Sequence, residues 1–67
     1  MIEHMTRKDV NYDVIYIGET YDDAEHGKTY KCIAEWYDSE GKFDSISMID
    51  ETGEDYIYDV SDFKKLQ

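Results

Sequence analysis

The sequence contains no proline and only one cysteine, Cys32. A single cysteine excludes an internal disulfide and favours a reducing compartment, most simply the cytoplasm. Long apolar runs are also missing, and no stretch approaches the roughly 20 residues that a membrane-spanning helix needs. The first ten residues carry Glu3, Arg7, Lys8 and Asp9 in place of an apolar run. We therefore expect no signal peptide and a cytoplasmic protein.

Basic residues are scarce: seven, against 17 acidic residues, give a formal net charge of −10. The segment from Asp9 to Asp62 has sixteen acidic residues and only three lysines, which leaves a formal charge of −13 there. Proteins that bind nucleic acids neutralise phosphates with Lys and Arg. We therefore expect no nucleic-acid partner and no anionic membrane surface. A basic protein surface is the partner that this charge favours.

The chain is long enough for one small domain, because 67 residues bury only about 60% of the surface of the unfolded chain. High charge with few aromatic residues is typical of disorder, but ten aromatic residues occur here. Short segments rich in β-branched and aromatic residues alternate with turn residues, and no helical period extends far. The pattern predicts an all-β fold, a small five-stranded barrel.

Residues 1–9 have no clear period, so we expect a flexible N-terminal arm there and the barrel over 10–67. Tight turns are expected at 38–41 and 50–53, where Asp, Ser and Gly gather. Ser61 is expected to cap one short 3-10 turn at 61–63, before the last strand. The expected strands fall within 13–18, 28–38, 42–50, 54–60 and 64–67.

Alternation in the second strand places Trp36 on the same face as Tyr30, Cys32 and Ala34. The first strand, whose VIYI segment does not alternate, leaves its inward face open. The expected core consists of Ile15, Ile17, Tyr30, Cys32, Ala34, Ile46, Met48, Val60 and Phe63.

The order of strands, turns and the single 3-10 turn resembles the SH3-like barrel. The segment TGEDYIYDVSDFKKL, residues 52–66, is similar to the distal hairpin, fourth strand, 3-10 turn and closing strand of SH3 domains. HGKTYKC, residues 26–32, resembles the place where a glycine ends their long first loop. Taken together, YIGETY, HGKTYKC and DETGEDYIY resemble small, largely uncharacterised SH3-like proteins of Gram-positive bacteria and their phages.

The sequence also departs from the SH3 domains that bind proline-rich peptides. Their first strand carries an Ala-Leu-Tyr-Asp-Tyr type segment, whereas VIYIGET stands here. A tryptophan pair opens their third strand, where this chain has GKFDS. They have a proline before the 3-10 turn, where this chain has Asp59 and Val60. The resemblance therefore implies the fold but not the polyproline groove.

The acidic loop at 18–28, between Gly18 and Gly27 as expected hinges, permits two interpretations. Asp22, Asp23, Glu25 and His26 offer oxygen and nitrogen ligands for a divalent cation, but their spacing does not match an EF-hand. The alternative is a solvated barrel loop that binds no metal, and the sequence favours this one. We therefore expect no metal and no cofactor.

No catalytic constellation is apparent. Cys32 lies on an alternating strand in acidic surroundings, which favours a buried structural thiol rather than a nucleophile. Adjacent carboxylates are expected by chance among 17 acidic residues, and general acid–base catalysis needs a pocket that separates their pKa values. We therefore do not expect an enzyme.

Seven tyrosines are more than so small a core needs, and tyrosine is favoured at interfaces. They either cover strand faces or form a contact surface with the acidic loop. The candidate binding residues are Tyr21, Asp22, Asp23, Tyr37, Tyr56 and Tyr58. Two functions fit this surface. One is a non-catalytic protein-interaction module with a basic partner. The other is an acidic inhibitor or nucleic-acid mimic, such as a phage counter-defence or immunity-type protein.

Overall fold

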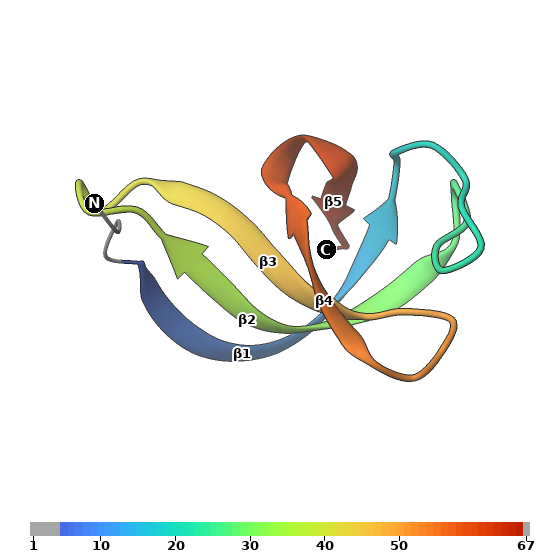
Figure 1. The fold of residues 1–67 in the computed structure, drawn as a ribbon, viewed down its shortest axis with the longest axis horizontal. Helices are drawn as coiled ribbons and strands as arrows, with labels where there is room; N and C mark the ends of the chain where they lie inside the picture. Colours follow the sequence, from blue (N-terminus) through green and yellow to red (C-terminus); the bar gives the residue numbers. More distant parts are fainter. Residues whose placement is uncertain (1–4, 67) are drawn as a thin grey trace.

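A computed structural model describes residues 5–66, and their fold is all-β, as the sequence predicts (Figure 1). Five antiparallel strands form one sheet in the order β4-β3-β2-β1-β5, curled into a half-barrel. A single 3-10 turn, η1, precedes the last strand. The elements are β1 (Thr6–Tyr16), β2 (Thr29–Tyr37), β3 (Phe43–Ile49), β4 (Asp55–Asp59), η1 (Val60–Asp62) and β5 (Phe63–Lys65).

The first strand begins earlier than expected. Residues 6–9, predicted as part of a flexible arm, pair with the end of β2, from Thr6 opposite Tyr37 to Asp9 opposite Ala34. Their side chains are exposed, so no apolar alternation marks them as a strand. Backbone pairing and the contact of the Arg7 guanidinium with the Trp36 ring, 5.6 Å from its centroid, hold them instead. Residues 1–4 of the predicted arm lie outside the described residues.

Six of the expected core residues are buried as predicted: Tyr30, Cys32, Ala34, Ile46, Met48 and Phe63. The prediction of a core position was wrong for three residues. Ile15 is only half-buried, and Ile17 and Val60 are exposed. A register shift between Asp9 and Tyr12 turns Val14 and Tyr16 inward, with Val14 opposite Tyr30. The buried cluster comprises Val14, Tyr16, Ala24, Tyr30, Cys32, Ile46, Met48 and Phe63.

A second register shift, between Cys32 and Ala34, breaks the expected alternation of β2. Beyond it Glu35 lies opposite Ile46 of the core, whereas Trp36 lies opposite Ser45 on the other face. The expectation that Trp36 shares a face with Tyr30 and Cys32 was therefore wrong. Ala34 is buried as predicted, but it lies on the outer face with Trp36.

Both tight turns are confirmed. Gly41 N–H donates to Asp38 O and Gly53 N–H to Asp50 O, at 2.9 Å and 3.0 Å. Both glycines have positive φ, +83° and +85°, a conformation that favours glycine. The 3-10 turn lies at 60–62, next to its predicted position, but Asp59 caps it. The Asp59 carboxylate accepts from Ser61 N–H at 3.0 Å, so Ser61 is not the cap.

Candidate functional site

The loop at 17–28 is held closed at its base by backbone hydrogen bonds. Tyr16 N–H donates to Lys28 O at 3.0 Å, and Gly27 N–H donates to Tyr16 O at 2.7 Å. Ile17 N–H joins the loop to the 3-10 turn by donating to Asp62 O at 2.8 Å. Gly27 has φ of +87°, which suits a bend. Gly18 has a different role from the expected hinge: a Cβ there would lie 2.7 Å from the Tyr16 hydroxyl. Glycine is therefore needed at 18 because the backbone passes so close to a buried ring.

The middle of the loop packs into the fold. Tyr21 and Ala24 exchange two backbone hydrogen bonds, 2.7 Å and 3.3 Å long, so the segment between them makes a tight turn. Ala24 is completely buried and belongs to the core cluster. Its neighbours keep solvent contact: Tyr21 is 62% exposed, Asp22 is exposed and Asp23 is partly exposed. The two hydrogen bonds and the burial of Ala24 thus hold the loop with Tyr21 and Asp22 exposed and Asp23 partly exposed.

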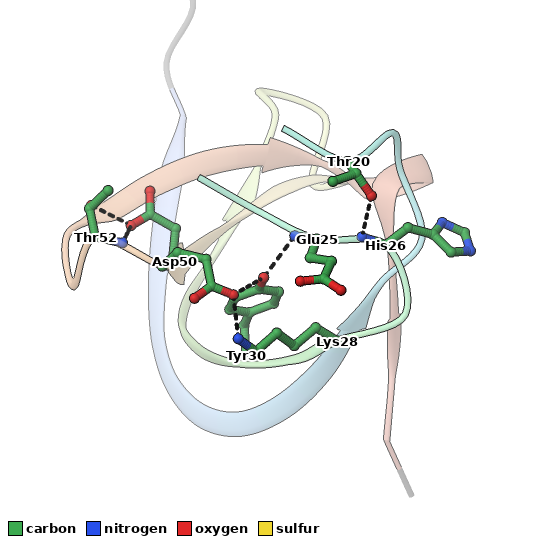
Figure 2. Close-up of polar contacts among 8 residues, drawn as sticks. Thr20, Glu25, His26, Lys28, Tyr30, Asp50 and Thr52 are labelled. Atoms are coloured by element: carbon green, nitrogen blue, oxygen red, sulfur yellow. Dashed lines mark hydrogen bonds and ion pairs between the residues drawn. The ribbon is translucent and has the colours of Figure 1, made fainter. Parts of the chain in front are cut away.

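The Tyr30 hydroxyl joins this loop to the turn between β3 and β4 (Figure 2). It accepts from Glu25 N–H at 2.8 Å and donates to the Glu51 carboxylate at 2.7 Å. Glu51 also forms an ion pair of 2.6 Å with Lys28, and its N–H donates to Asp23 O at 2.9 Å. This ion pair raises the pKa of Lys28 and, with the Tyr30 bond, lowers the pKa of Glu51. The positive charge of Lys28 is therefore already matched.

His26 does not face these carboxylates. Its backbone N–H donates to Thr20 Oγ1 at 3.0 Å, and Nδ1 lies 3.0 Å from Gly18 O, while the ring points away from Glu25 (Figure 2). Within residues 5–66 no group of three or more His, Cys, Asp or Glu side chains has the arrangement to hold a metal ion. Asp22, Asp23, Glu25 and His26 are thus not assembled as one ligand set in this part of the chain.

Two of the candidate tyrosines lie on β4, beside the acidic groups of the loop and the turn. Tyr56 is 48% exposed and donates to Glu54 at 3.0 Å. This bond raises the pKa of Tyr56, and the nearby Asp23 and Asp50 carboxylates add to the effect. Burial, followed by the charges of Asp50 and Asp23, raises the pKa of Tyr58 to about 12. The backbone bond from Glu51 N–H to Asp23 O holds the loop beside the turn that leads into β4.

We call this surface the acid–tyrosine face: Tyr21, Asp22 and Asp23 of the loop, Glu51 and Glu54 of the turn, and Tyr56 and Tyr58 of β4. The Tyr16 ring forms its base, packed edge-on against Tyr58 with centroids 5.8 Å apart. The Tyr16 hydroxyl donates to Glu19 O at 2.7 Å. Five of the six predicted binding residues thus come from two segments that the fold brings together.

Asp50 lies beneath this face and was not singled out from the sequence. It is only 5% exposed. Its Oδ1 accepts from Thr52 N–H at 2.9 Å and from the Thr52 hydroxyl at 2.6 Å, which orders the turn (Figure 2). Its Oδ2 is buried without a hydrogen-bond partner among the described residues. Buried polar atoms without a partner are uncommon in folded proteins. The sequence signal was only that an Asp opens a tight turn.

Tyr37, the sixth predicted residue, lies away from this face. It is the last residue of β2, whereas the loop joins the first residue of that strand. Its hydroxyl donates to Glu35 at 2.5 Å, and the Tyr12 hydroxyl donates to the other carboxylate oxygen at 2.5 Å. Lys65 Nζ lies 3.5 Å from Glu35 and 4.9 Å from the centroid of the Tyr12 ring. The side chain of Tyr37 is thus engaged in an internal cluster.

Glu35 itself is only 4% exposed. Burial alone would raise its pKa, but the bonds from Tyr12 and Tyr37 and the charge of Lys65 outweigh burial and lower the pKa. Burial and the bond to Glu35 raise the pKa of Tyr12. We call Tyr12, Glu35, Tyr37 and Lys65 the Glu35 cluster. Sequence reasoning missed it because a bulge, which no local pattern marks, turns Glu35 inward.

Cys32 is completely buried, as expected, and its thiol lies 3.4 Å from Ala34 O. Burial raises its pKa, which disfavours the reactive thiolate.

No enclosed pocket forms within residues 5–66, so the acid–tyrosine face is an open surface. The same residues include no helix with the length and apolar character of a membrane span.

Comparison with protein-family models, with curated proteins and with solved structures finds no match to this chain. The function of the acid–tyrosine face is therefore inferred from its geometry and charge.

Proposed function

We propose that this chain is a non-catalytic protein-interaction module of the SH3-like class, which binds a basic protein surface through its acid–tyrosine face. The strand order β4-β3-β2-β1-β5 and the 3-10 turn before β5 support the class. One observation carries the function. Tyr30 and Glu51 lock the loop to the turn, so that exposed tyrosines and carboxylates from separate segments form one surface.

The charge of this face determines the kind of partner. Lys28 is the only lysine or arginine in residues 17–28 and 50–59, and it is paired with Glu51. No free lysine or arginine of these two segments therefore neutralises the negative charges of Asp22, Asp23 and Glu54. Lysine and arginine side chains bind both carboxylates and the faces of tyrosine rings. Opposite charge also accelerates association, in a way that added salt weakens.

The tyrosines supply the contact area. Tyrosine buries a large rigid ring at low entropic cost and keeps a polar end for hydrogen bonding, which is why it is enriched at binding hot spots. Tyr21 and Tyr56 are the most exposed of the candidate rings, at 62% and 48%. Tyr58 packs on Tyr16 and is held in place. A partner would thus meet two accessible rings on an ordered base.

A charge-matched pair of double variants tests this function. The first removes two carboxylates from the face, Asp22→Asn with Asp23→Asn. The second removes two exposed carboxylates elsewhere, Glu40→Gln with Asp44→Asn, and has the same net charge. The probe is an oligolysine peptide, with its affinity measured by fluorescence anisotropy at about 0.05 M and 0.2 M salt. We expect the face variant to lose about tenfold more affinity than its control.

The Tyr21→Leu variant should also lose affinity for oligolysine, because leucine keeps apolar bulk but lacks the ring face. No binding of oligolysine by the unmodified protein would overturn the proposal. Equal losses in both double variants would overturn the assignment to this face.

The second candidate is an acidic inhibitor or nucleic-acid mimic. It is favoured by exposed carboxylates beyond the face, such as Glu40 and Asp44. A mimic acts through its whole field, so both double variants should then weaken binding equally. It should also displace DNA from a basic DNA-binding protein. In either case we expect no binding of a labelled oligonucleotide at about 0.15 M salt, because phosphates need clustered Lys and Arg.

A further inference from the structure

β4 is an edge of the sheet, because it pairs with β3 on one side only. Two of its side chains are among the most exposed apolar groups of the protein, Ile57 at 62% and Tyr56 at 48%. Val60, directly after the strand, is 40% exposed. An unpaired edge presents backbone donors and acceptors to any extended segment that approaches it. The acid–tyrosine face includes the inner side of this same strand.

The register identifies which backbone groups are free. Asp50 N–H donates to Glu54 O at 3.0 Å, so these two residues form a hydrogen-bonded pair. Bonded and non-bonded pairs alternate along antiparallel strands. Tyr56 and Tyr58, opposite Met48 and Ile46, are therefore bonded to β3.

Asp55 and Ile57 fall in the non-bonded pairs, opposite Ile49 and Ser47. Their N–H and C=O groups point away from β3. No backbone hydrogen bond outside the strand ladders involves either residue within the described chain, 5–66.

We propose that the partner binds by adding an extended, basic segment as a sixth strand along β4, an inference that rests on the proposed function. The backbone of that segment bonds to Asp55 and Ile57. Its side chains on the outer side lie beside Asp55, Ile57 and Asp59, which share one face of β4. Lysine or arginine fits next to the two aspartates, and an apolar residue fits next to Ile57.

The inner side of the added strand faces the acid–tyrosine face. Tyr56 and Tyr58 point to this side, since they lie opposite Met48 and Ile46 of the core. Basic residues here would meet the tyrosine rings and the carboxylates of Asp23 and Glu54. Strand addition therefore uses both features of the face, and the backbone bonds give it a defined direction.

Charge selects a basic partner rather than a second copy of this chain. Two β4 strands paired antiparallel about Ile57 would set Asp55 opposite Asp59 twice, and like charges directly opposite destabilise a sheet. The aspartates thus protect the edge from self-association. The other sheet edge, β5, carries Lys64 and Lys65, which repel a basic strand. Of the two edges, β4 is the one that a basic segment can join.

Two peptide probes of identical composition test the inference. One is a short peptide that repeats Lys-Lys-Val-Lys, all of L configuration, so that one side of the strand alternates lysine and valine and the other side carries lysine. The other has the same sequence with adjacent pairs of D residues set among the L residues, which disrupts the regular backbone of a strand. Amide hydrogen exchange of the protein is followed by NMR with each probe. We expect the all-L peptide to slow exchange of the Asp55 and Ile57 amides at least about tenfold, and the mixed peptide to leave them unchanged.

The Ile57→Pro variant removes the outward N–H without breaking a bond to β3, and Ile57→Thr is the matched control that keeps it. Proline should lower affinity for the all-L peptide about tenfold relative to threonine. Exchange in the unmodified protein decides the matter if the proline variant does not fold. Equal binding of both probes, or unprotected Asp55 and Ile57 amides in the all-L complex, would overturn strand addition alone. No binding of either probe would overturn the proposed function as well.

Discussion

Two buried carboxylates, Glu35 and Asp50, have opposite surroundings. Glu35 is 4% exposed, and both of its oxygens accept hydrogen bonds, from Tyr12 and Tyr37, with Lys65 beside them. Asp50 is 5% exposed, but only its Oδ1 accepts bonds, and Oδ2 has no partner within residues 5–66. Each carboxylate has tyrosines near it. Only at Glu35 do the tyrosines donate to the carboxylate.

Tyrosines and carboxylates therefore have two different roles in this protein, a structural one around Glu35 and a binding one on the acid–tyrosine face. In the Glu35 cluster the hydroxyls, the carboxylate and the lysine satisfy one another, which stabilises the sheet and leaves little for a partner. On the acid–tyrosine face, Asp22 and Asp23 form no ion pair within residues 5–66, and the rings of Tyr21 and Tyr56 stay accessible. A surface that keeps such groups available is suited to binding.

The largest expected effect comes from neutralising each carboxylate. Glu35→Gln removes the charge and one of the two oxygens that accept from Tyr12 and Tyr37, and it should cost about 2 kcal/mol in the free energy of unfolding. Asp50→Asn keeps an oxygen for the Thr52 bonds and removes a buried unpartnered charge, so it should change the free energy by less than about 1 kcal/mol. Urea unfolding at pH 7 measures both. A larger loss for Asp50→Asn would reverse the comparison.

Removing single hydroxyls should give the next largest difference. Tyr12→Phe deletes the donor to Glu35 and should cost about 1.5 kcal/mol. Tyr58→Phe deletes a hydroxyl that makes no hydrogen bond in the described part of the chain, so the cost should stay within about 0.5 kcal/mol. Thermal unfolding of the two variants provides the measurement. Equal costs would show that Tyr58 is bonded to a group such as Asp50 in solution.

Acid should weaken the Glu35 cluster. The pKa of Glu35 is lowered in the folded state, so its contribution is complete above the unfolded value of about 4.3 and is lost as pH falls through the folded value. The stability difference between the unmodified protein and Glu35→Gln should therefore shrink from pH 7 to about pH 3. Urea titrations at both pH values test this. A difference that stays constant would mean that the carboxylate gains nothing from its charge.

Added salt should have the smallest effect. Unlike acid, it should stabilise the protein, and part of this gain should come from the acid–tyrosine face. Four ion pairs occur within residues 5–66, so most of the 17 acidic residues have no basic partner there. Screening of their repulsion should raise the melting temperature by about 2–4 °C between low salt and about 0.2 M NaCl. Asp22→Asn with Asp23→Asn should reduce this rise. A flat or falling melting temperature would indicate that the charges are already well separated.

Local chemistry made much of the fold predictable. Asp-to-Gly segments predicted the turns at 38–41 and 50–53, because glycine adopts positive φ there and aspartate accepts the turn N–H groups. The acidic loop was predicted as a barrel loop, and five of the six candidate residues lie on the acid–tyrosine face. Tyr37 lies apart from the other five, because its hydroxyl donates to Glu35, a residue two positions away that only pairing with β3 turns inward.

The sequence by itself determined the strand and turn order, the acidic charge and the abundance of tyrosine, since each depends on residue type or on neighbours along the chain. Only the tertiary structure decided the bulges between Asp9 and Tyr12 and between Cys32 and Ala34, because register depends on how strands pair. The first bulge turns Val14 and Tyr16 inward, and the second exchanges the faces of Glu35 and Trp36. The tertiary structure also joined Asp23 to Glu51, 28 positions apart in the sequence, and left β4 at the edge, because both follow from long-range pairing.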